Sequence, residues 1–510
     1  MRKILKFLFS QVTIVSFLIV LQLLAIAGSL MRISAYFLYF DVFLQFLSIA
    51  TVVLIINRHD NPSYKLAWVI PILIFPLFGG LFYLFITGQL HTKYYFNKLS
   101  TNEAKINAGY SQDEKVLEEI SKTFPERRST VRYINNVCGS AASRCYGARY
   151  FPQGEDMWKS MLEELSKASR YIFIESFIIK EGVMWNSILE ILKHKAAEGV
   201  DVRVMYDGMG SMTLLPNKYP KELENFGIKC KVFSPFTPFL SSLQNNRDHR
   251  KIVVIDGKIA YTGGTNLADE YVNIDHPLGH WKDMSVMIKG EAAFCFARMF
   301  LHLWWGITSS PEDIKIFEPE TEENENSHDG YVMPFADMPQ DKYLTGEFIY
   351  LDIINKAKKY IYITTPYLIL DHEMVVALKN ASFSGIDVRI ICPSSTDHWY
   401  ARAVAYSYYK ELLDVGIKLY EYTPGFVHGK TFVSDDEISV VGSINLDFRS
   451  LYLHFECAAW FLGSSIVHSV KKDFEDTLEK CNVITHEMCM PKNIFKRILN
   501  ALLKLFAPLM

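Results

Sequence analysis

Two short stretches of the chain carry the same polar residues at the same spacing, H-x-K-x4-D-x6-G-[GS]-x-N. The first copy contains His249, Lys251, Asp256 and Asn266, and the second contains His428, Lys430, Asp435, Ser443 and Asn445. One constant offset relates the corresponding positions, so the copies share a register. A single His-x-Lys pair is usually a solvated surface feature, whereas two complete copies are very improbable by chance. The pattern therefore indicates an internal duplication that carries function.

Paired histidines and lysines suit chemistry at a tetrahedral phosphate. The lysines, joined by Asn266 and Asn445, would neutralise and orient phosphate oxygens and stabilise the charge that grows in the transition state. One neutral imidazole would attack phosphorus to form a covalent intermediate, and the other, protonated, would donate a proton to the leaving alcohol. A single histidine cannot hold both protonation states at once, which gives a physical reason for two copies.

The aspartates of the two copies are expected to hold loops rather than to react. Side chains alternate along a strand, so each histidine shares a face with the lysine two residues later. The run KIVVIDGKIAYTGG predicts a strand, an Asp-Gly turn and a second strand. Asp256 and Asp435 lie at an odd offset from their histidines, which favours the opposite face or the turn. There they would act through hydrogen bonds.

Each histidine also needs a carboxylate that fixes its tautomer and supports the imidazolium. Glu456 follows His428, and Asp283 follows His249 within the segment HWKD, so these two acids are the candidates. Two histidines and several carboxylates could instead bind a metal. Two lysines at the centre of the site would repel a divalent cation, so we expect no metal and no cofactor.

The elements around both copies follow one order, which predicts an α/β fold of two tandem α-β-α halves. In the first half the expected order is helix 156–170, strand 171–179, helix 187–199 and strand 200–207. In the second half it is helix 347–359, strand 360–369, helix 375–385 and strand 386–393. Strands that alternate with helices indicate largely parallel sheets covered on both faces. The halves would meet about a pseudo-twofold axis as one catalytic unit.

Three apolar runs near the N-terminus, residues 7–31, 33–57 and 66–90, contain almost no charge. A bilayer core takes a helix of ~20 apolar residues, so each run is long enough to span it. We therefore expect transmembrane helices and a multi-pass protein of the cytoplasmic membrane. The first run could instead be a signal peptide that ends near Ala27. Basic residues are nearly balanced on the two sides, so the orientation stays open.

The chain is divided into regions by these changes in composition. We assign membrane-anchoring segments to 1–91, a linker to 92–129, the first half to 130–316, an acidic linker to 317–340, the second half to 341–490 and a basic amphipathic helix to 491–510. In that last helix an apolar face with Phe495, Leu499 and Leu502 opposes a basic face. Such a helix suits an anionic lipid surface, and docking on the protein's own core is an alternative of comparable weight.

The duplicated pattern resembles the HKD motif of the phospholipase D superfamily. The run NPSYKLAWVIPILIFPLFGGLFYLFITG, the segment YDGMGS around Asp207 and the segment GGTNLADEY are similar to bacterial cardiolipin synthases, so the resemblance covers nearly the whole chain. It implies a metal-independent reaction in which one phosphatidylglycerol gives its phosphatidyl group to a histidine and glycerol leaves. The terminal hydroxyl of a second phosphatidylglycerol then takes the group, giving cardiolipin. These two lipids and the bilayer are the expected partners.

The family pattern also implies roles for single residues. His249 would be the nucleophile and His428 the acid and later the base, although the near-symmetry leaves the reverse open. Gly264 stands where the second copy has Ser443, which implies that the first copy lacks a hydroxyl contact to phosphate. The first apolar run exceeds the two membrane segments that such synthases commonly have.

Three other functions compete with this reading. A hydrolytic phospholipase D would use water as the acceptor, and only acceptor access and water exclusion separate it from a transferase. A nuclease would need a basic groove, which a formal net charge of -3 does not indicate, so we expect no nucleic acid partner. A non-catalytic lipid binder would have a decayed motif, and both copies are intact. The sequence does not indicate the oligomeric state.

Overall fold

The computed structural model describes the chain except for residues 1–19, 21–34, 60, 76–78, 81–82, 84–89, 108–110, 236–244, 320–327, 340, 342, 490–492 and 510. The chain divides into two compact units. The larger unit comprises 97–235 and 247–500 and holds both copies of the duplicated pattern. The smaller unit comprises 1–96, 236–246 and 501–510.

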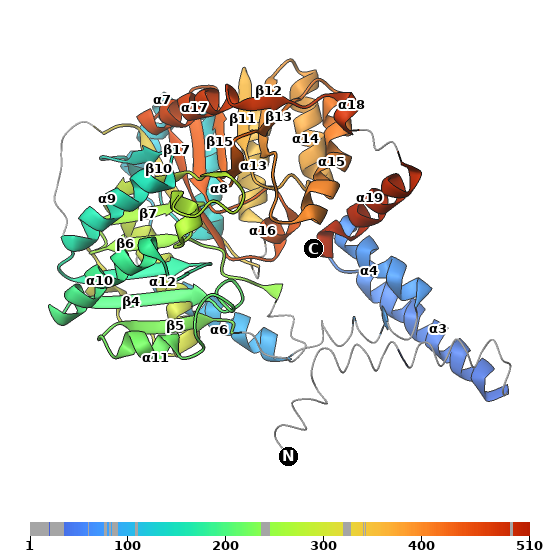
Figure 1. Ribbon diagram of the computed structural model, residues 1–510, viewed down its shortest axis with the longest axis horizontal. Coiled ribbons are helices and arrows are strands. Elements are labelled where there is room, and N and C mark those ends of the chain that lie inside the picture. The colour runs from blue at the N-terminus through green and yellow to red at the C-terminus, as the bar shows by residue number, and fades with distance from the viewer. Residues whose placement is uncertain are drawn as a thin grey trace. The chain divides into compact units, whose positions relative to one another are not determined.

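A seven-stranded sheet of order β2-β9-β7-β6-β3-β4-β5 forms the first half of the larger unit (Figure 1). Its strands are β2 (Arg149–Phe151), β3 (Tyr171–Ser176), β4 (Asp201–Asp207), β5 (Lys229–Phe233), β6 (Ile252–Ile255), β7 (Ile259–Gly263) and β9 (Ser285–Lys289). β3, β4 and β5 are parallel, whereas β6, β7 and β9 pair antiparallel. The helices of this half are α9 (Gly154–Ser166), α10 (Val183–Ala197), α11 (Tyr219–Glu224) and α12 (Glu291–Thr308).

The second half is built on a nine-stranded sheet of order β1-β10-β17-β16-β15-β11-β12-β13-β18. Its strands are β1 (Ser143–Arg144), β10 (Tyr331–Asp337), β11 (Tyr360–Thr364), β12 (Asp387–Pro393), β13 (Lys418–Tyr422), β15 (Thr431–Ser434), β16 (Ile438–Gly442), β17 (Glu456–Leu462) and β18 (Cys481–Val483). Its helices are α13 (Thr345–Lys356), α14 (His372–Phe383), α15 (Trp399–Leu413), α16 (Phe448–Tyr452) and α17 (Ser465–Leu478). β11, β12 and β13 are parallel.

Two further contacts join the halves. The nearly fully buried helix α12 packs against β6 and β7 of the first sheet and β10 of the second. A two-stranded parallel sheet pairs β8 (His280–Lys282) of the first half with β14 (Gly425–Val427) of the second. The segment before the first half also folds onto this unit as α7 (Glu114–Thr123) and α8 (Arg128–Cys138).

The two tandem α/β halves are confirmed, but their sheets are mixed rather than largely parallel. Each copy of the pattern forms an antiparallel hairpin, β6–β7 or β15–β16, beside three parallel strands. The hairpin follows from the tight turns at Asp256 and Asp435, because parallel strands need a long crossover connection instead. The repeated order of helices and strands indicated two halves, although β1 and β10 from the predicted first half and linker join the second sheet, and the turn residues explain the antiparallel strands.

The smaller unit contains α3 (Ala35–Ile56) and α4 (Pro62–Ile74). Ile55, Trp68, Ile72 and Tyr83 form a small buried cluster, against which Leu509 packs. Among the described residues, no helix combines the length and the apolar character that a membrane crossing requires, so the predicted transmembrane helices are not confirmed. The first predicted run and its reading as a signal peptide lie outside the described residues, apart from Val20.

Candidate active site

The segments that carry the two histidines pair with the opposite half. β14 leads directly into His428, and the His428 N–H donates to the carbonyl of Lys282 over 2.7 Å. In the first copy Asp248 forms a bridge with Phe455, and the His249 N–H donates to the Phe455 carbonyl over 2.9 Å. Each histidine is therefore fixed beside a segment of the other half.

The carboxylates also pair with histidines of the opposite half. His249 Nδ1 lies 2.8 and 3.1 Å from the two carboxylate oxygens of Glu456, and His428 Nδ1 lies 2.7 Å from Asp283 Oδ2. In sequence each acid follows the histidine of its own half, but in the structure it contacts the histidine of the other half. Because Nδ1 faces a carboxylate, Nε2 is the nitrogen left for phosphorus. Both histidine–carboxylate pairs need both halves.

The two lysines lie within the same buried cluster. Lys251 Nζ donates to the carbonyl of His249 over 2.5 Å, and Lys430 Nζ donates to the carbonyl of His428 over 2.5 Å. Burial lowers the pKa of Lys251 to about 8 and that of Lys430 to about 7, although the nearby carboxylates act to raise both. A phosphate bound between the lysines would favour their charged forms, so the cluster suits an anion.

Both histidines are buried, and burial is the main cause that lowers their pKa values. The pKa of His249 lies well below its ordinary value, because the two lysines and the second imidazole add to the effect of burial. The pKa of His428 is lowered by burial and by Lys430, while Asp283 opposes both. Before substrate binds, both imidazoles are therefore neutral at pH 7, and a bound phosphate would favour the protonation that an acid needs.

The two aspartates of the pattern lie in the hairpin turns, away from the histidines. Asp256 has a positive φ of 53° and accepts hydrogen bonds from the N–H groups of Ser169, Arg170 and Tyr171 at 2.9, 2.7 and 2.9 Å. Asp435, with φ 58°, accepts from the backbone of residues 358, 359 and 360 at 2.7, 2.8 and 3.1 Å. Each carboxylate thus ties a hairpin turn to the start of a parallel strand.

Replacing Asp256 by alanine should lower the free energy of unfolding by about 1–3 kcal/mol, because three backbone N–H groups, one of them buried, lose their acceptor. The measurement is denaturant unfolding of the purified protein. Asp156→Ala serves as the control, since Asp156 is half-exposed and its ion pair with Lys159 is long, at 3.7 Å. A loss of activity at unchanged stability would instead place Asp256 among the groups that act on the substrate.

Ser443 and Gly264 occupy equivalent positions beside the two acids. The Ser443 hydroxyl donates to the Glu456 carboxylate and accepts the N–H of Cys457 at 3.0 Å. A Cβ at Gly264 would lie 2.1 Å from Asp283 Oδ1, so only glycine leaves room for that acid. Glycine at position 264 therefore goes with the aspartate Asp283, and serine at position 443 goes with the longer glutamate Glu456. A direct contact of Ser443 with phosphate stays a prediction.

The two asparagines are buried but differ in their partners. Asn266 Oδ1 accepts the N–H of Ile178 over 3.1 Å. Asn445 Oδ1 has no hydrogen-bond partner among the residues that the structure describes. Asn445 is therefore the asparagine with hydrogen-bonding capacity left for a ligand.

His454 belongs to the site but was not singled out from the sequence. Its ring centroid lies 5.5 Å from that of His249, and its Nδ1 lies 3.8 Å from Glu456 Oε1. Neither ring nitrogen has a hydrogen-bond partner within the described part of the chain, and burial lowers the pKa to about 4. The feature of the sequence that could have identified His454 is its position two residues before Glu456. His249, His454 and Glu456 are close enough to share a metal ion, but the two lysines disfavour one.

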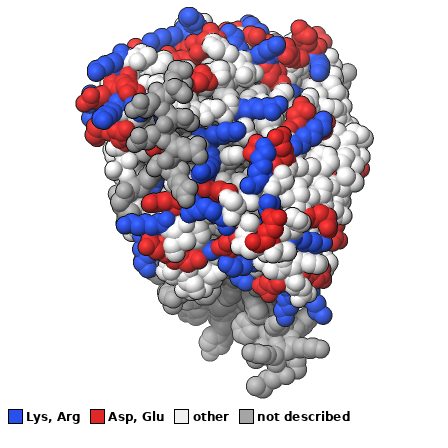
Figure 2. All heavy atoms as spheres, turned by 90° about the vertical axis from the view of Figure 1, so that its left-hand side faces the viewer, with Lys and Arg blue, Asp and Glu red and all other residues white. Residues whose placement is uncertain are grey.

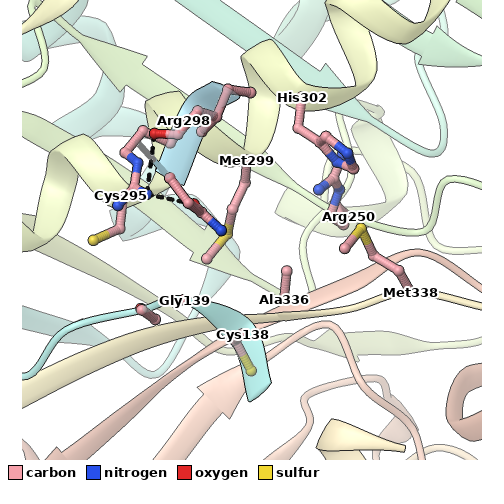
Figure 3. Close-up of a pocket in the computed structure, with 12 residues that line it drawn as sticks. Cys138, Gly139, Arg250, Cys295, Arg298, Met299, His302, Ala336 and Met338 are labelled. Atoms are coloured by element: carbon pink, nitrogen blue, oxygen red, sulfur yellow. Dashed lines mark hydrogen bonds between the residues drawn. The ribbon is translucent and has the colours of Figure 1, made fainter. Parts of the chain in front are cut away.

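Arg250 lies between His249 and Lys251 in sequence but contacts a different region. Its Nε donates to Glu175 Oε1 over 2.7 Å. Figure 3 shows it beside a cavity of about 50 Å³, with His302 next to it and Arg298 and Cys295 at the other end. Neither histidine of the duplicated pattern lines this cavity, so it is separate from the candidate site.

Comparison with known protein families places both halves in one group. Residues 161–304 and 350–478 match the family described as cardiolipin synthase, PLD-like domain. Residues 46–86 match the phospholipase D-nuclease N-terminal family. The two matches to the first family cover the repeated elements of both halves.

Individual relatives extend the similarity over most of the chain. A Streptococcus mutans protein without assigned function is 41% identical over 91% of this chain and 100% of its own length. Cardiolipin synthase 2 of Bacillus anthracis is 33% identical over 91% of this chain and 89% of its own length. The crystal structure of phosphatidylserine synthase from Haemophilus influenzae Rd KW20 superposes with a TM-score of 0.56 at 14% identity. It covers 75% of this chain and 98% of that structure, which shows a shared fold.

Proposed function

Because the chain belongs to the cardiolipin synthase family of phospholipase D-like proteins, we propose that it is a phosphatidyltransferase that makes cardiolipin. It would transfer the phosphatidyl group of one phosphatidylglycerol to a second one and release glycerol. The observation that carries this proposal is the pair of crossed histidine–carboxylate contacts, buried together with two lysines. Two neutral imidazoles supported by carboxylates suit a covalent, two-step phosphoryl chemistry.

In the first step His249 Nε2 attacks the phosphorus of phosphatidylglycerol. A P–N bond forms, the bond between phosphorus and the glycerol oxygen breaks, and His428 passes a proton to that oxygen. Glu456 would stabilise the positive charge that develops on His249, and Asp283 would hold His428 in the same way. The lowered pKa of His249 agrees with its role as the neutral nucleophile.

In the second step the terminal hydroxyl of another phosphatidylglycerol attacks the phosphohistidine. The now neutral His428 removes the hydroxyl proton, an O–P bond forms and the P–N bond breaks. Cardiolipin leaves, and His249 returns to its neutral form. The two lysines would stabilise the charge on the equatorial oxygens in both steps.

The test is incubation of the purified protein with phosphatidylglycerol vesicles without divalent metal, followed by mass spectrometry of the lipids. Equal amounts of cardiolipin and glycerol are expected. Formation of phosphatidic acid without cardiolipin would show that the protein is a hydrolase rather than a transferase. No turnover with retained lipid binding would favour the non-catalytic binder.

A nucleic acid substrate is disfavoured by the charge distribution. On the face drawn in Figure 2, acidic and basic side chains are intermingled rather than separated into a basic groove. The formal net charge of -3 agrees with this view. Binding to a polyanion draws on clustered lysines and arginines, so a lipid substrate fits better.

The lysine pKa values predict an alkaline limit to substrate binding. Each ammonium is charged below its pKa and loses its charge as the pH rises through about 7 for Lys430 and about 8 for Lys251. We expect kcat/KM for phosphatidylglycerol to fall above this window. Lys430→Arg should move the limit to higher pH, since a guanidinium stays charged. A flat profile up to pH 9 would contradict this role for the lysines.

We further propose that the protein acts at the membrane surface, where its substrates lie. α19 (Ile494–Phe506) supports this, because its apolar side chains are exposed and Phe495 is 77% accessible. Helix α3 of the smaller unit exposes Tyr39 and Phe46 to 73% and 70%. A multi-pass arrangement in the cytoplasmic membrane remains part of the proposal, supported by the apolar runs of the sequence.

The double variant Phe495→Asp, Leu499→Asp should lose activity on anionic vesicles but keep activity on phosphatidylglycerol dispersed in detergent micelles. The charged side chains would oppose insertion of the apolar face among lipids. Phe383→Asp is the matched control, because Phe383 is 72% exposed on α14. An equal loss on vesicles and micelles would show that α19 supports the fold rather than the lipid contact.

A further inference from the structure

Arg449 is a partly buried cation that forms no ion pair with any residue the structure describes. It lies on α16, in the segment that connects Asn445 to Glu456. Among the residues that the structure describes, no carboxylate oxygen comes within 4.0 Å of its guanidinium. By contrast, other arginines of the larger unit have carboxylate partners, as in the pairs Arg127–Glu437, Arg203–Glu312, Arg389–Asp387 and Arg402–Glu421. A desolvated arginine without a paired anion is unfavourable unless a ligand supplies one.

Arg449 has charged neighbours of both signs, Asp447 and Arg247. Burial and the charge of Arg247 lower the pKa of Arg449, although Asp447 and Tyr400 oppose them. Arg247 already donates to Asp207 Oδ1 over 3.3 Å and to the Ser234 carbonyl over 3.0 Å. Arg247 therefore has a carboxylate within 4.0 Å, whereas Arg449 has none among the described residues.

Two backbone contacts connect Arg449 to the site. The carbonyl of Arg449 accepts the N–H of His454 over 2.9 Å, and the His454 ring lies 5.5 Å from the ring of His249. The N–H of Phe455 donates to the carbonyl of Arg247 over 2.8 Å, next to the Asp248–Phe455 bridge. Arg449 and His454 are thus fixed relative to His249 by short hydrogen bonds.

The proposed reaction requires a second anion near the first. The attacking hydroxyl belongs to a lipid with its own phosphodiester, which three glycerol carbons separate from that hydroxyl. When the hydroxyl reaches the phosphohistidine, this spectator phosphate lies beside the histidine pair. The two lysines contact the carbonyls of the histidines, and in the proposed mechanism they bind the reacting phosphate. A further cation is needed for the second phosphate.

We propose that Arg449 and His454 form the acceptor subsite, in which Arg449 binds the phosphodiester of the second phosphatidylglycerol and His454 accepts a hydrogen bond from its central glycerol hydroxyl. This inference rests on the proposed transferase function. The guanidinium fork matches two phosphate oxygens. The imidazole of His454 stays neutral and has a nitrogen lone pair for a hydroxyl donor.

Two assays on the purified full-length protein separate acceptor binding from phosphatidyl transfer to histidine. The first follows cardiolipin formation from phosphatidylglycerol in detergent micelles. The second follows incorporation of labelled glycerol into phosphatidylglycerol, where the acceptor carries no phosphate. Arg449→Gln should slow cardiolipin formation at low phosphatidylglycerol concentration by about 10- to 100-fold, as expected for a lost charged hydrogen bond. Glycerol exchange should fall far less, and Arg449→Lys should restore part of the synthesis.

Arg389→Gln is the control, since Arg389 pairs with Asp387 on β12 and should leave the ratio of the two activities unchanged. An equal fall of both activities in Arg449→Gln would overturn the acceptor role, as would unchanged cardiolipin formation. His454→Ala should likewise affect synthesis more than exchange. Wild-type protein that shows neither activity would refute the proposed function itself, which distinguishes that failure from a failure of the subsite.

Discussion

The His249→Ala variant should form cardiolipin about 10⁴-fold more slowly than the wild type, or not at all. In the proposed mechanism His249 supplies the nitrogen that bonds to phosphorus, and its Nδ1 is held 2.8 Å from Glu456. His428→Ala should show a loss of similar size, because in the same proposed mechanism His428 protonates the leaving glycerol and then activates the acceptor. The measurement is the rate of cardiolipin formation from phosphatidylglycerol, with binding to vesicles followed in parallel.

The two variants should differ in one respect. A phosphatidyl ester with a good leaving group needs no acid, so His428→Ala should still release that group once per protein molecule. His249→Ala should release none. His194→Ala is the control, since the His194 side chain is 73% exposed and lies outside the site. Comparable cardiolipin formation in wild type and either site variant would contradict the two-histidine mechanism.

Replacing Glu456 by glutamine should affect His249 rather than His428, with a fall in kcat of about 10²- to 10⁴-fold. The amide keeps the shape of the side chain but removes the charge that supports the imidazolium. Asp283→Asn should have the corresponding effect on His428, because Asp283 Oδ2 lies 2.7 Å from His428 Nδ1. Both effects follow from the crossing of partners between the halves.

Modification of imidazoles by diethyl pyrocarbonate, followed residue by residue with mass spectrometry, separates the two pairings. Glu456→Gln should change the modification rate of His249 and leave that of His428 within experimental error. Asp283→Asn should do the opposite. If each substitution instead changed the histidine that precedes it in its own half, the crossed arrangement would be wrong.

Much of the candidate site could be predicted from the sequence because the duplication repeats each candidate group. The constant offset between His249 and His428 identified both histidines, both lysines and both asparagines at once. The odd offset of Asp256 and Asp435 correctly suggested turns, since alternation along a strand is a local property. Asp283 and Glu456 were chosen because each histidine needs a carboxylate to fix its tautomer, and the structure places both acids beside histidines.

The pairing across the halves could not be predicted, because it depends on contacts distant in sequence. The β8–β14 pairing and the Asp248–Phe455 bridge bring each acid to the other half's histidine. His454 was missed for a related reason. A lone histidine gives no pattern, and its place beside His249 depends on the same bridge. The sheets are mixed because the turn chemistry at Asp256 and Asp435 prevails over the strand–helix alternation.

The most direct test of the covalent two-histidine mechanism is to trap the intermediate and locate it. His428→Ala would be incubated briefly with a phosphatidyl ester of p-nitrophenol, quenched and digested, and its peptides analysed by mass spectrometry. The account predicts one phosphatidyl group on His249, a matching burst of p-nitrophenol and no adduct in the His249→Ala variant. An adduct on His428 in the His249→Ala variant, together with no adduct on His249 in the His428→Ala variant, would show that the two histidines have the opposite roles. Turnover by the wild type without an adduct on either histidine would contradict the covalent mechanism.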